Sequence, residues 1–225
     1  MIPVSAVLGT GERWRIVDEQ RASLADLLAG LSPEEWEAPT RCGDWRVRDV
    51  AAHLTIAARL THRAVVAEFV RARGNFDRMI HDSAVREAEL PVAEIVANLR
   101  SIIGSRRLAP TTSPREPLLD ILVHGQDIAL ALGRTREMPP DAARDAADRA
   151  WTMRVPPRPW PLPKARLVAT DITWTRGAGE EVRAPIAALL LLVTGRPEAA
   201  RQWCERVGAE GVTGHPFSGD SPQIL

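Results

Sequence analysis

The chain has 225 residues, of which 45% are hydrophobic and 26% are charged. This composition excludes a largely disordered chain, and the length suits one domain with an appendage or two small domains. The 29 basic residues balance 29 acidic ones, so the overall charge does not favour nucleic acid or an anionic membrane as a partner. Two cysteines, Cys42 and Cys204, form no disulfide framework and no C-x-x-C motif, which fits a reducing compartment.

No segment of the sequence has the features of a signal peptide or a membrane span. The start, MIPVSAVLGTGERW, lacks a basic region followed by a long apolar stretch. The longest apolar run, IAALLLLV, is far shorter than the roughly 20 residues that cross a bilayer. We therefore expect a cytoplasmic protein without a membrane partner.

The N-terminal half is predicted to form consecutive helices. The first covers about residues 12–31. In LSPEEWEAPT, Ser32 is placed to cap a short helix, Pro33 to occupy its first position and Glu35 to return the capping hydrogen bond. Another long helix is expected over residues 47–73, ending at Gly74.

Three further helical segments are predicted between this helix and the C-terminal part of the chain. They cover about residues 84–89, 91–104 and 113–133, and the last ends at Gly133. Four main helices joined by modest loops predict a helical bundle.

The pattern changes after a helix expected at residues 140–153. The proline-rich VPPRPWPLP marks a stiff connection, and the boundary is placed there. RLVATDITWT alternates like a strand, RGAGE turns the chain, EVRAP is expected to return as the hairpin partner, and helices follow at 185–193 and 197–207. The expected division is residues 1–154 for the bundle, 164–210 for a small α+β domain and 211–225 for a tail.

The helix that contains DILVHGQDIALALG carries a narrow line of polar residues. At about 100° per residue, Asp120, His124 and Asp127 lie within roughly 60° of one another, with apolar side chains on both sides. A polar line partly buried between packed neighbours is therefore expected, and an ordinary solvent-facing surface is the alternative.

A second histidine lies on the apolar face of another predicted helix. Val50, Ala57, Leu60 and Ala64 all fall within about 60° of His53, which directs His53 toward the core. Two helices then aim polar groups inward. His53 is either a neutral, hydrogen-bonded core residue, bonded for instance to Asp120, or a metal ligand.

The donor types are those of a catalytic metal site. Residues four apart on a helix share one face, so Asp120 and His124 can bind one cation, and His53 completes a set of three with a position left open. Nitrogen and oxygen donors suit zinc, nickel, iron or manganese. Asp127 is either a hydrogen-bond acceptor behind a ligand or an extra ligand.

Three segments together resemble one known family, and the resemblance extends over most of the chain. APTRCGDWRVRDVAAHL, LLDILVHGQDIALALG and LVATDITWTRGAGEEVRAPIAALLLLVTGR are similar to the mycothiol-dependent maleylpyruvate isomerase family. The resemblance implies a mainly α protein, with a DinB-like four-helix bundle followed by a small α+β C-terminal domain. It also implies a divalent metal, zinc, bound by His53, Asp120 and His124, and no catalytic residue is assigned beyond this metal site.

Two positions depart from the family pattern. Asp120 stands where the characterised isomerase has glutamate, and the shorter acid is expected either to draw the metal closer to its helix or to hold it less firmly. Arg46 stands where relatives often have Ser or Thr, so we expect Asp44 to cap the following helix, with Asp49 near its positive end.

The resemblance further implies mycothiol as the thiol cofactor and a small electrophilic metabolite as the substrate of an isomerase or S-transferase, with the metal activating the thiol. Arg196, in the Gly-Arg pair of VTGRP, is the expected cofactor-binding residue; a surface arginine at a helix end is the alternative. The partners expected are small molecules, without nucleic acid, and the protein is expected to be a monomer or a homodimer. The alternative function is a non-catalytic module that binds a small molecule or a metal.

Overall fold

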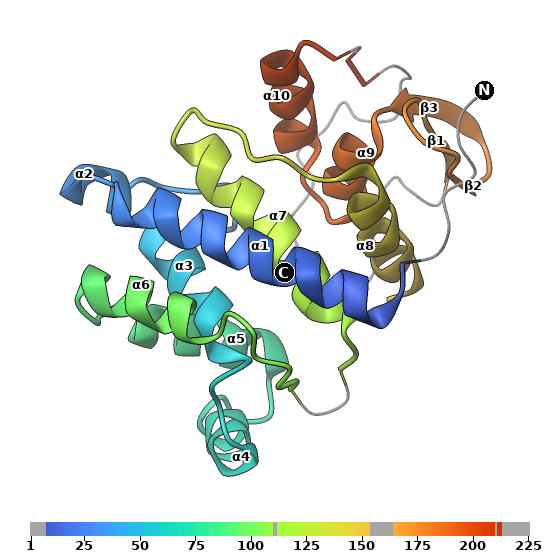
Figure 1. Ribbon diagram of the computed structural model, residues 1–225. Coiled ribbons are helices and arrows are strands. Elements are labelled where there is room, and N and C mark those ends of the chain that lie inside the picture. Colours follow the sequence, from blue (N-terminus) through green and yellow to red (C-terminus); the bar gives the residue numbers. More distant parts are fainter. Residues whose placement is uncertain (1–7, 110–111, 154–163, 210, 213–225) are drawn as a thin grey trace.

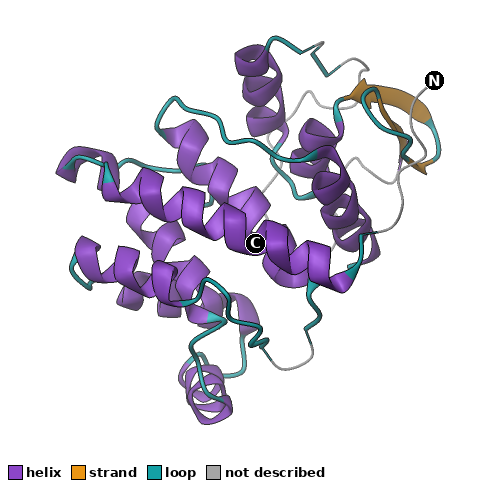
Figure 2. Cartoon of the chain, viewed as in Figure 1, coloured by secondary structure: helices purple, strands orange, loops and turns teal. Residues whose placement is uncertain are grey.

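The structure is a computed structural model that describes residues 8–109, 112–153, 164–209 and 211–212. Helices make up most of the described chain, and one small sheet lies at one side (Figure 2). The mainly α fold class expected from the sequence is confirmed.

The first eight helices build the larger part of the molecule. They are α1 (Thr10–Ala29), α2 (Pro33–Trp36), α3 (Val47–Ile56), α4 (His62–Arg71), α5 (Phe76–Glu87), α6 (Val92–Ser101), α7 (Arg115–Ala131) and α8 (Pro140–Thr152). Helices α1 and α3 each pack against both α6 and α7, which closes a four-helix bundle (Figure 1). Helix α5 packs on α3 outside this ring, and α4 contacts α5 at one end of the bundle.

Local sequence signals set the ends of the first helices. The inner face of α1 repeats every three or four residues, and Val17, Leu24 and Leu28 on it are fully buried. The predicted capping box of α2 is confirmed: the Glu35 N–H donates to the Ser32 hydroxyl at 3.3 Å, and the Ser32 N–H donates to the Glu35 carboxylate at 2.8 Å.

The single helix expected over residues 47–73 is wrong, because the chain breaks between α3 and α4. The Thr61 hydroxyl accepts a hydrogen bond from the Ala64 N–H at 3.3 Å and starts a new helix there. Leu60 and Ala64 are therefore not on one continuous face with His53. The short segment expected at residues 84–89 is the end of the longer α5, which Asn75 caps.

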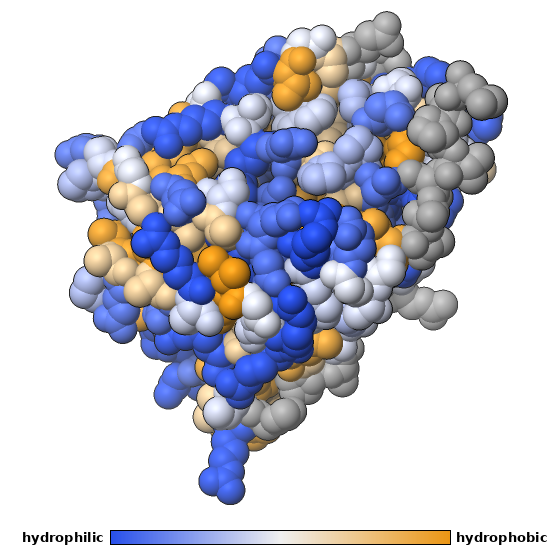
Figure 3. Space-filling view, in the orientation of Figure 1, coloured by the Kyte–Doolittle hydropathy of each residue, from blue (hydrophilic) through white to orange (hydrophobic). Residues whose placement is uncertain are grey.

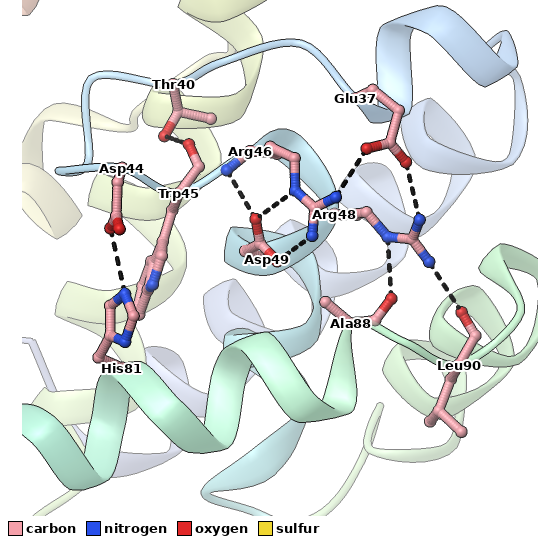
Figure 4. Close-up of polar contacts among 10 residues, drawn as sticks. All are labelled: Glu37, Thr40, Asp44, Trp45, Arg46, Arg48, Asp49, His81, Ala88 and Leu90. Atoms are coloured by element: carbon pink, nitrogen blue, oxygen red, sulfur yellow. Dashed lines mark hydrogen bonds and ion pairs between the residues drawn. The ribbon is translucent and has the colours of Figure 1, made fainter.

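The start of α3 is held by Asp49 rather than by Asp44, so the cap expected from the sequence is wrong (Figure 4). The Asp49 carboxylate accepts from the backbone N–H and from Nε of Arg46, both at 2.8 Å. The carboxylate thus satisfies a free N–H at the positive end of the helix. Asp44 instead pairs with Nε2 of His81 on α5 at 3.1 Å, which ties the loop before α3 to the neighbouring helix.

The C-terminal part is a three-stranded sheet with two helices. Its elements are β1 (Ala165–Ala169), β2 (Thr175–Gly177), β3 (Glu180–Ala184), α9 (Ile186–Val193) and α10 (Pro197–Val207). The strand order is β2-β1-β3, with β1 antiparallel to β2 and parallel to β3. The hairpin partner of β1 is therefore β2. The expectation that EVRAP returns as that partner is wrong, because this segment crosses to the other edge of β1 as a parallel strand.

Helix α9 joins the sheet to the bundle. Every residue from Ile186 to Val193 is buried, because α9 packs against α8, α10 and β1. Helix α8 packs against both α7 and α9, and α10 also contacts α7. The proline-rich segment lies outside the described residues, so the expected division at 1–154, 164–210 and 211–225 stays a prediction.

The turn between β2 and β3 requires glycine at residue 177. Gly177 has φ +81°, and a Cβ there would lie 2.2 Å from the carbonyl oxygen of Ala165. We expect Gly177→Ala to destabilise the fold by about 2–5 kcal/mol, since the left-handed backbone and the steric overlap both oppose it. Denaturant unfolding measures this effect. Gly11→Ala, where a Cβ meets nothing within 4 Å, is the control, and an equal loss for both variants would contradict the assigned turn.

The surface is polar over most of the face in Figure 3, and apolar residues lie there in small separate groups. In the part of the chain that the structure describes, none of the helices has the length and apolar character needed to cross a membrane.

Candidate metal centre

The bundle brings His53, Asp120 and His124 to one place. His53 lies on α3, and the other two lie on the adjacent helix α7. One ligand atom of each residue lies within 4.8 Å of the other two, and the centroids of the two imidazole rings are 5.0 Å apart. The three residues expected to share a cation are therefore close enough to meet at a common point.

The polar line on α7 lies in the interior. His124 and Asp127 are each 2% exposed, Asp120 is half-buried, and the apolar residues on both sides of the line are buried. The alternative of a solvent-facing helix surface is wrong, because α1, α3, α8 and α10 all pack around α7.

Two of the three donors have no partner within the described protein. Neither the His53 imidazole nor the Asp120 carboxylate forms a hydrogen bond or an ion pair with another described residue, so the alternative of a His53–Asp120 hydrogen bond is absent. Burial, with the positive charges of His124 and Arg196, lowers the pKa of His53 to about 3, which keeps its ring neutral. Burial also raises the pKa of Asp120, although His124 opposes this. Half-buried donors of these types without partners fit a divalent cation.

The third donor, His124, is held from behind. Its Nδ1 donates to Oδ2 of Asp127 at 3.0 Å, which leaves Nε2 for another partner. Burial alone would lower the pKa of His124, but the hydrogen bonds with Asp127 and Cys42 raise it to about 10. A carboxylate behind a histidine fixes the orientation and tautomer of the ring, as it does behind histidine ligands of metals. The sequence left this role of Asp127 open between acceptor and extra ligand.

Arg196 in turn holds Asp127. Its Nε lies 2.8 and 3.0 Å from the two carboxylate oxygens, and its Nη2 lies 2.8 Å from Oδ2. Although burial opposes ionisation, Arg196 and His124 lower the pKa of Asp127 to about 2. The pair is charged and almost completely shielded from solvent, with side chains 2% and 0% exposed.

The alternative of Arg196 as a surface residue is thus wrong. Its Nη1 also donates to the Thr194 carbonyl oxygen at 2.7 Å, and its Nη2 lies 3.7 Å from Sγ of Cys42. The guanidinium is occupied by groups of the protein in this structure. Its expected role in cofactor binding stays a prediction.

A second group of potential ligands shares His124 but is less suited to a cation. One ligand atom each of Cys42, His124 and Asp127 lies within 4.8 Å of the other two. The positive charge of Arg196 already occupies this position, and it would repel a metal ion. The cluster of His53, Asp120 and His124 is therefore the better candidate.

Trp45 covers the histidines from the loop before α3. Its ring centroid lies 5.1 Å from that of His53 and 6.2 Å from that of His81, which lies beside it in Figure 4. Trp45 is 4% exposed, and its Nε1 has no hydrogen-bond partner among the described residues. The indole thus limits the positions open to the His53 ring, a contribution that the sequence did not reveal.

His53 and Asp120 line a pocket between α1, α3, α7 and the segment before α7. The pocket holds about 540 Å³ of empty space, including its opening to solvent. Arg21, Arg107 and Glu116 also line it, whereas His124 is not one of the lining residues. A small molecule in the pocket would reach the metal ligands from the side of His53 and Asp120.

These features define a class: helical-bundle proteins with imidazole and carboxylate groups that line a pocket. Residues 17–129, just over half of the chain, match the family model described as mycothiol maleylpyruvate isomerase N-terminal domain, and the chain belongs to this family. No curated protein sequence matches it.

Solved structures extend the comparison to almost the whole chain. The fold is similar to the crystal structure of the mycothiol-dependent maleylpyruvate isomerase and to that of a histidine-to-alanine variant of it. In each case the TM-score is 0.62 and the identity is 13%, over 97% of this chain and 98% of the other. The match includes the C-terminal part, and it confirms the fold that the sequence resemblance implied.

Proposed function

We propose that this protein is a mycothiol-using isomerase or S-transferase for a small electrophilic metabolite, with a divalent metal, zinc, held by His53, Asp120 and His124. The observation that carries the proposal is the pair of donors, His53 and Asp120, that line a pocket without any hydrogen-bond or ion-pair partner among the described residues. Family membership supports the choice of thiol, and the similar solved enzyme supports the choice of reaction.

Each residue of the site has a defined task in this proposal. A zinc ion bound there would lower the pKa of a coordinated thiol, so that the nucleophilic thiolate forms at neutral pH. His53 supplies a neutral nitrogen, and the ring of Trp45 restricts its position. Asp127 keeps Nε2 of His124 directed away from itself, and Arg196 keeps Asp127 ionised.

The test measures thermal unfolding of metal-free protein with zinc, with mycothiol, and with both. We expect mycothiol to raise the Tm only when zinc is present, because a ligand that binds the folded state stabilises it by mass action. An equal shift by mycothiol with and without zinc would show that the thiol does not bind at the metal. No shift at millimolar mycothiol would contradict the cofactor.

A second measurement separates an enzyme from a binding module. The metal-free protein should stay folded by circular dichroism and regain thiol-dependent consumption of an electrophile when zinc is added. Unfolding on metal removal, without any thiol reaction on metal addition, would instead identify a structural metal.

A further inference from the structure

The pocket beside the proposed metal site contains an arginine whose guanidinium is only partly used. Arg21 lies on the inner face of α1 and is 5% exposed. Its Nη1 donates to the carbonyl oxygen of Ile102 at 2.7 Å. No hydrogen bond of Nε or Nη2 with a described residue is present, although the side chain lines the pocket.

The nearby carboxylates compensate the charge of Arg21 only in part. Asp18 lies 3.9 Å from Nη1, and Asp18 already accepts from the Gly104 N–H at 2.8 Å and pairs with Arg106 at 2.8 Å. Asp120, across the pocket, is not within ion-pair distance and belongs to the proposed metal ligands. Burial lowers the pKa of Arg21, although Asp18 and Asp120 oppose this, so a buried cation is left with incomplete compensation.

The other charged side chains that line the pocket do not cancel this positive charge. Glu116 is neutralised by Arg149, whose Nη2 lies 2.5 Å from it, and also accepts from the Ser113 hydroxyl at 2.6 Å. Arg107 at the exposed rim forms no side-chain hydrogen bond or ion pair with a described residue. The pocket therefore suits a small anionic ligand.

We propose that Arg21 binds a carboxylate group of the small molecule that occupies this pocket, and so selects acidic substrates. The planar guanidinium presents two adjacent donors, Nε and Nη2, which suit the two oxygens of a carboxylate. Whether the acid is a substrate rests on the proposed function, whereas its binding to Arg21 can be measured without metal.

The experiment compares succinate with succinamide, its uncharged analogue, by isothermal titration into metal-free and zinc-loaded protein. We expect succinate to bind and succinamide to bind at least about 10-fold more weakly, since hydrogen bonds to charged groups are the strong ones. Arg21→Met should weaken succinate about 10- to 100-fold in both forms and leave the zinc content unchanged. Arg21→Lys, which keeps the charge but not the fork, should lie between wild type and Arg21→Met.

Arg100→Met is the matched control. Arg100 pairs with Asp26 at 3.1 Å and does not line the pocket, so its loss should not change succinate binding. If Arg21→Met does not fold, the succinate affinity of Arg21→Lys is compared with that of the wild type instead. Equal succinate affinity in wild type and the Arg21 variants, or equal affinity for succinate and succinamide, would overturn the inference. Failure of the wild-type protein to bind zinc would instead contradict the proposed function. The inference would still be tested, because the titration into metal-free protein measures the role of Arg21.

Discussion

His53→Ala is expected to abolish tight zinc binding while the bundle stays folded. The change removes one of three donors that converge within 4.8 Å, and loss of a group behind a ligand already costs about 10- to 100-fold in metal affinity. Loss of a ligand itself should therefore weaken zinc by at least about 100-fold. Folding should change little, because His53 is half-buried and forms no hydrogen bond with a described residue.

Zinc titration and thermal unfolding measure the two parts of this prediction. At a zinc concentration of 100 times Kd, the wild type gains about 2.7 kcal/mol of stability, and His53→Ala should gain almost none. His81→Ala is the control: this ring also stacks on Trp45, but it bonds to Asp44 and Asp82 and is not one of the three donors. Equal zinc binding by wild type and His53→Ala, or negligible metal in both, would reject the ligand assignment.

The features predicted well from the sequence depend on neighbours along the chain. The capping box at Ser32 and the inward positions of Asp120 and His124 follow from residues within one or two helical turns. The sequence pattern does not predict the break between α3 and α4, although Thr61 carries a local capping signal: its hydroxyl accepts from the Ala64 N–H three residues later. The apolar periodicity continues across the break and hides this cap.

The features that were missed depend on partners far away in sequence. Strand β3 pairs in parallel with β1, and a local pattern predicts a strand but not its partner. Arg196 is buried because it binds Asp127, 69 residues earlier. Arg21 did leave a signal: it falls on the apolar face of α1 between Val17 and Leu24, where a charged residue requires a partner or a ligand.

Arg196→Met is expected to be the most destabilising of the site substitutions. It leaves the carboxylate of Asp127, which is fully shielded from solvent, without its main counter-charge. Removing one partner of a buried ion pair costs about 3–5 kcal/mol, because the remaining charge cannot be hydrated. Asp127→Asn should cost a similar amount by leaving the guanidinium unpaired, and it should also weaken zinc about 10- to 100-fold by releasing the His124 ring.

The double variant Asp127→Asn/Arg196→Met shows whether the two costs share one cause. With both charges gone, no buried ion is left alone, so the loss in stability should be smaller than the sum of the single losses by about 1–3 kcal/mol in denaturant unfolding. Arg201→Met, which breaks a solvent-exposed pair with Glu198 on α10, should cost at most about 1 kcal/mol and leave zinc affinity unchanged.

Strictly additive losses in the double variant would mean that the Asp127–Arg196 pair does not couple α7 to the segment before α10. An unchanged zinc affinity in Asp127→Asn would mean that the carboxylate does not orient His124. If both results were found, the bundle alone would position the metal ligands. The results that we expect make the C-terminal part, through Arg196, a component of the metal site.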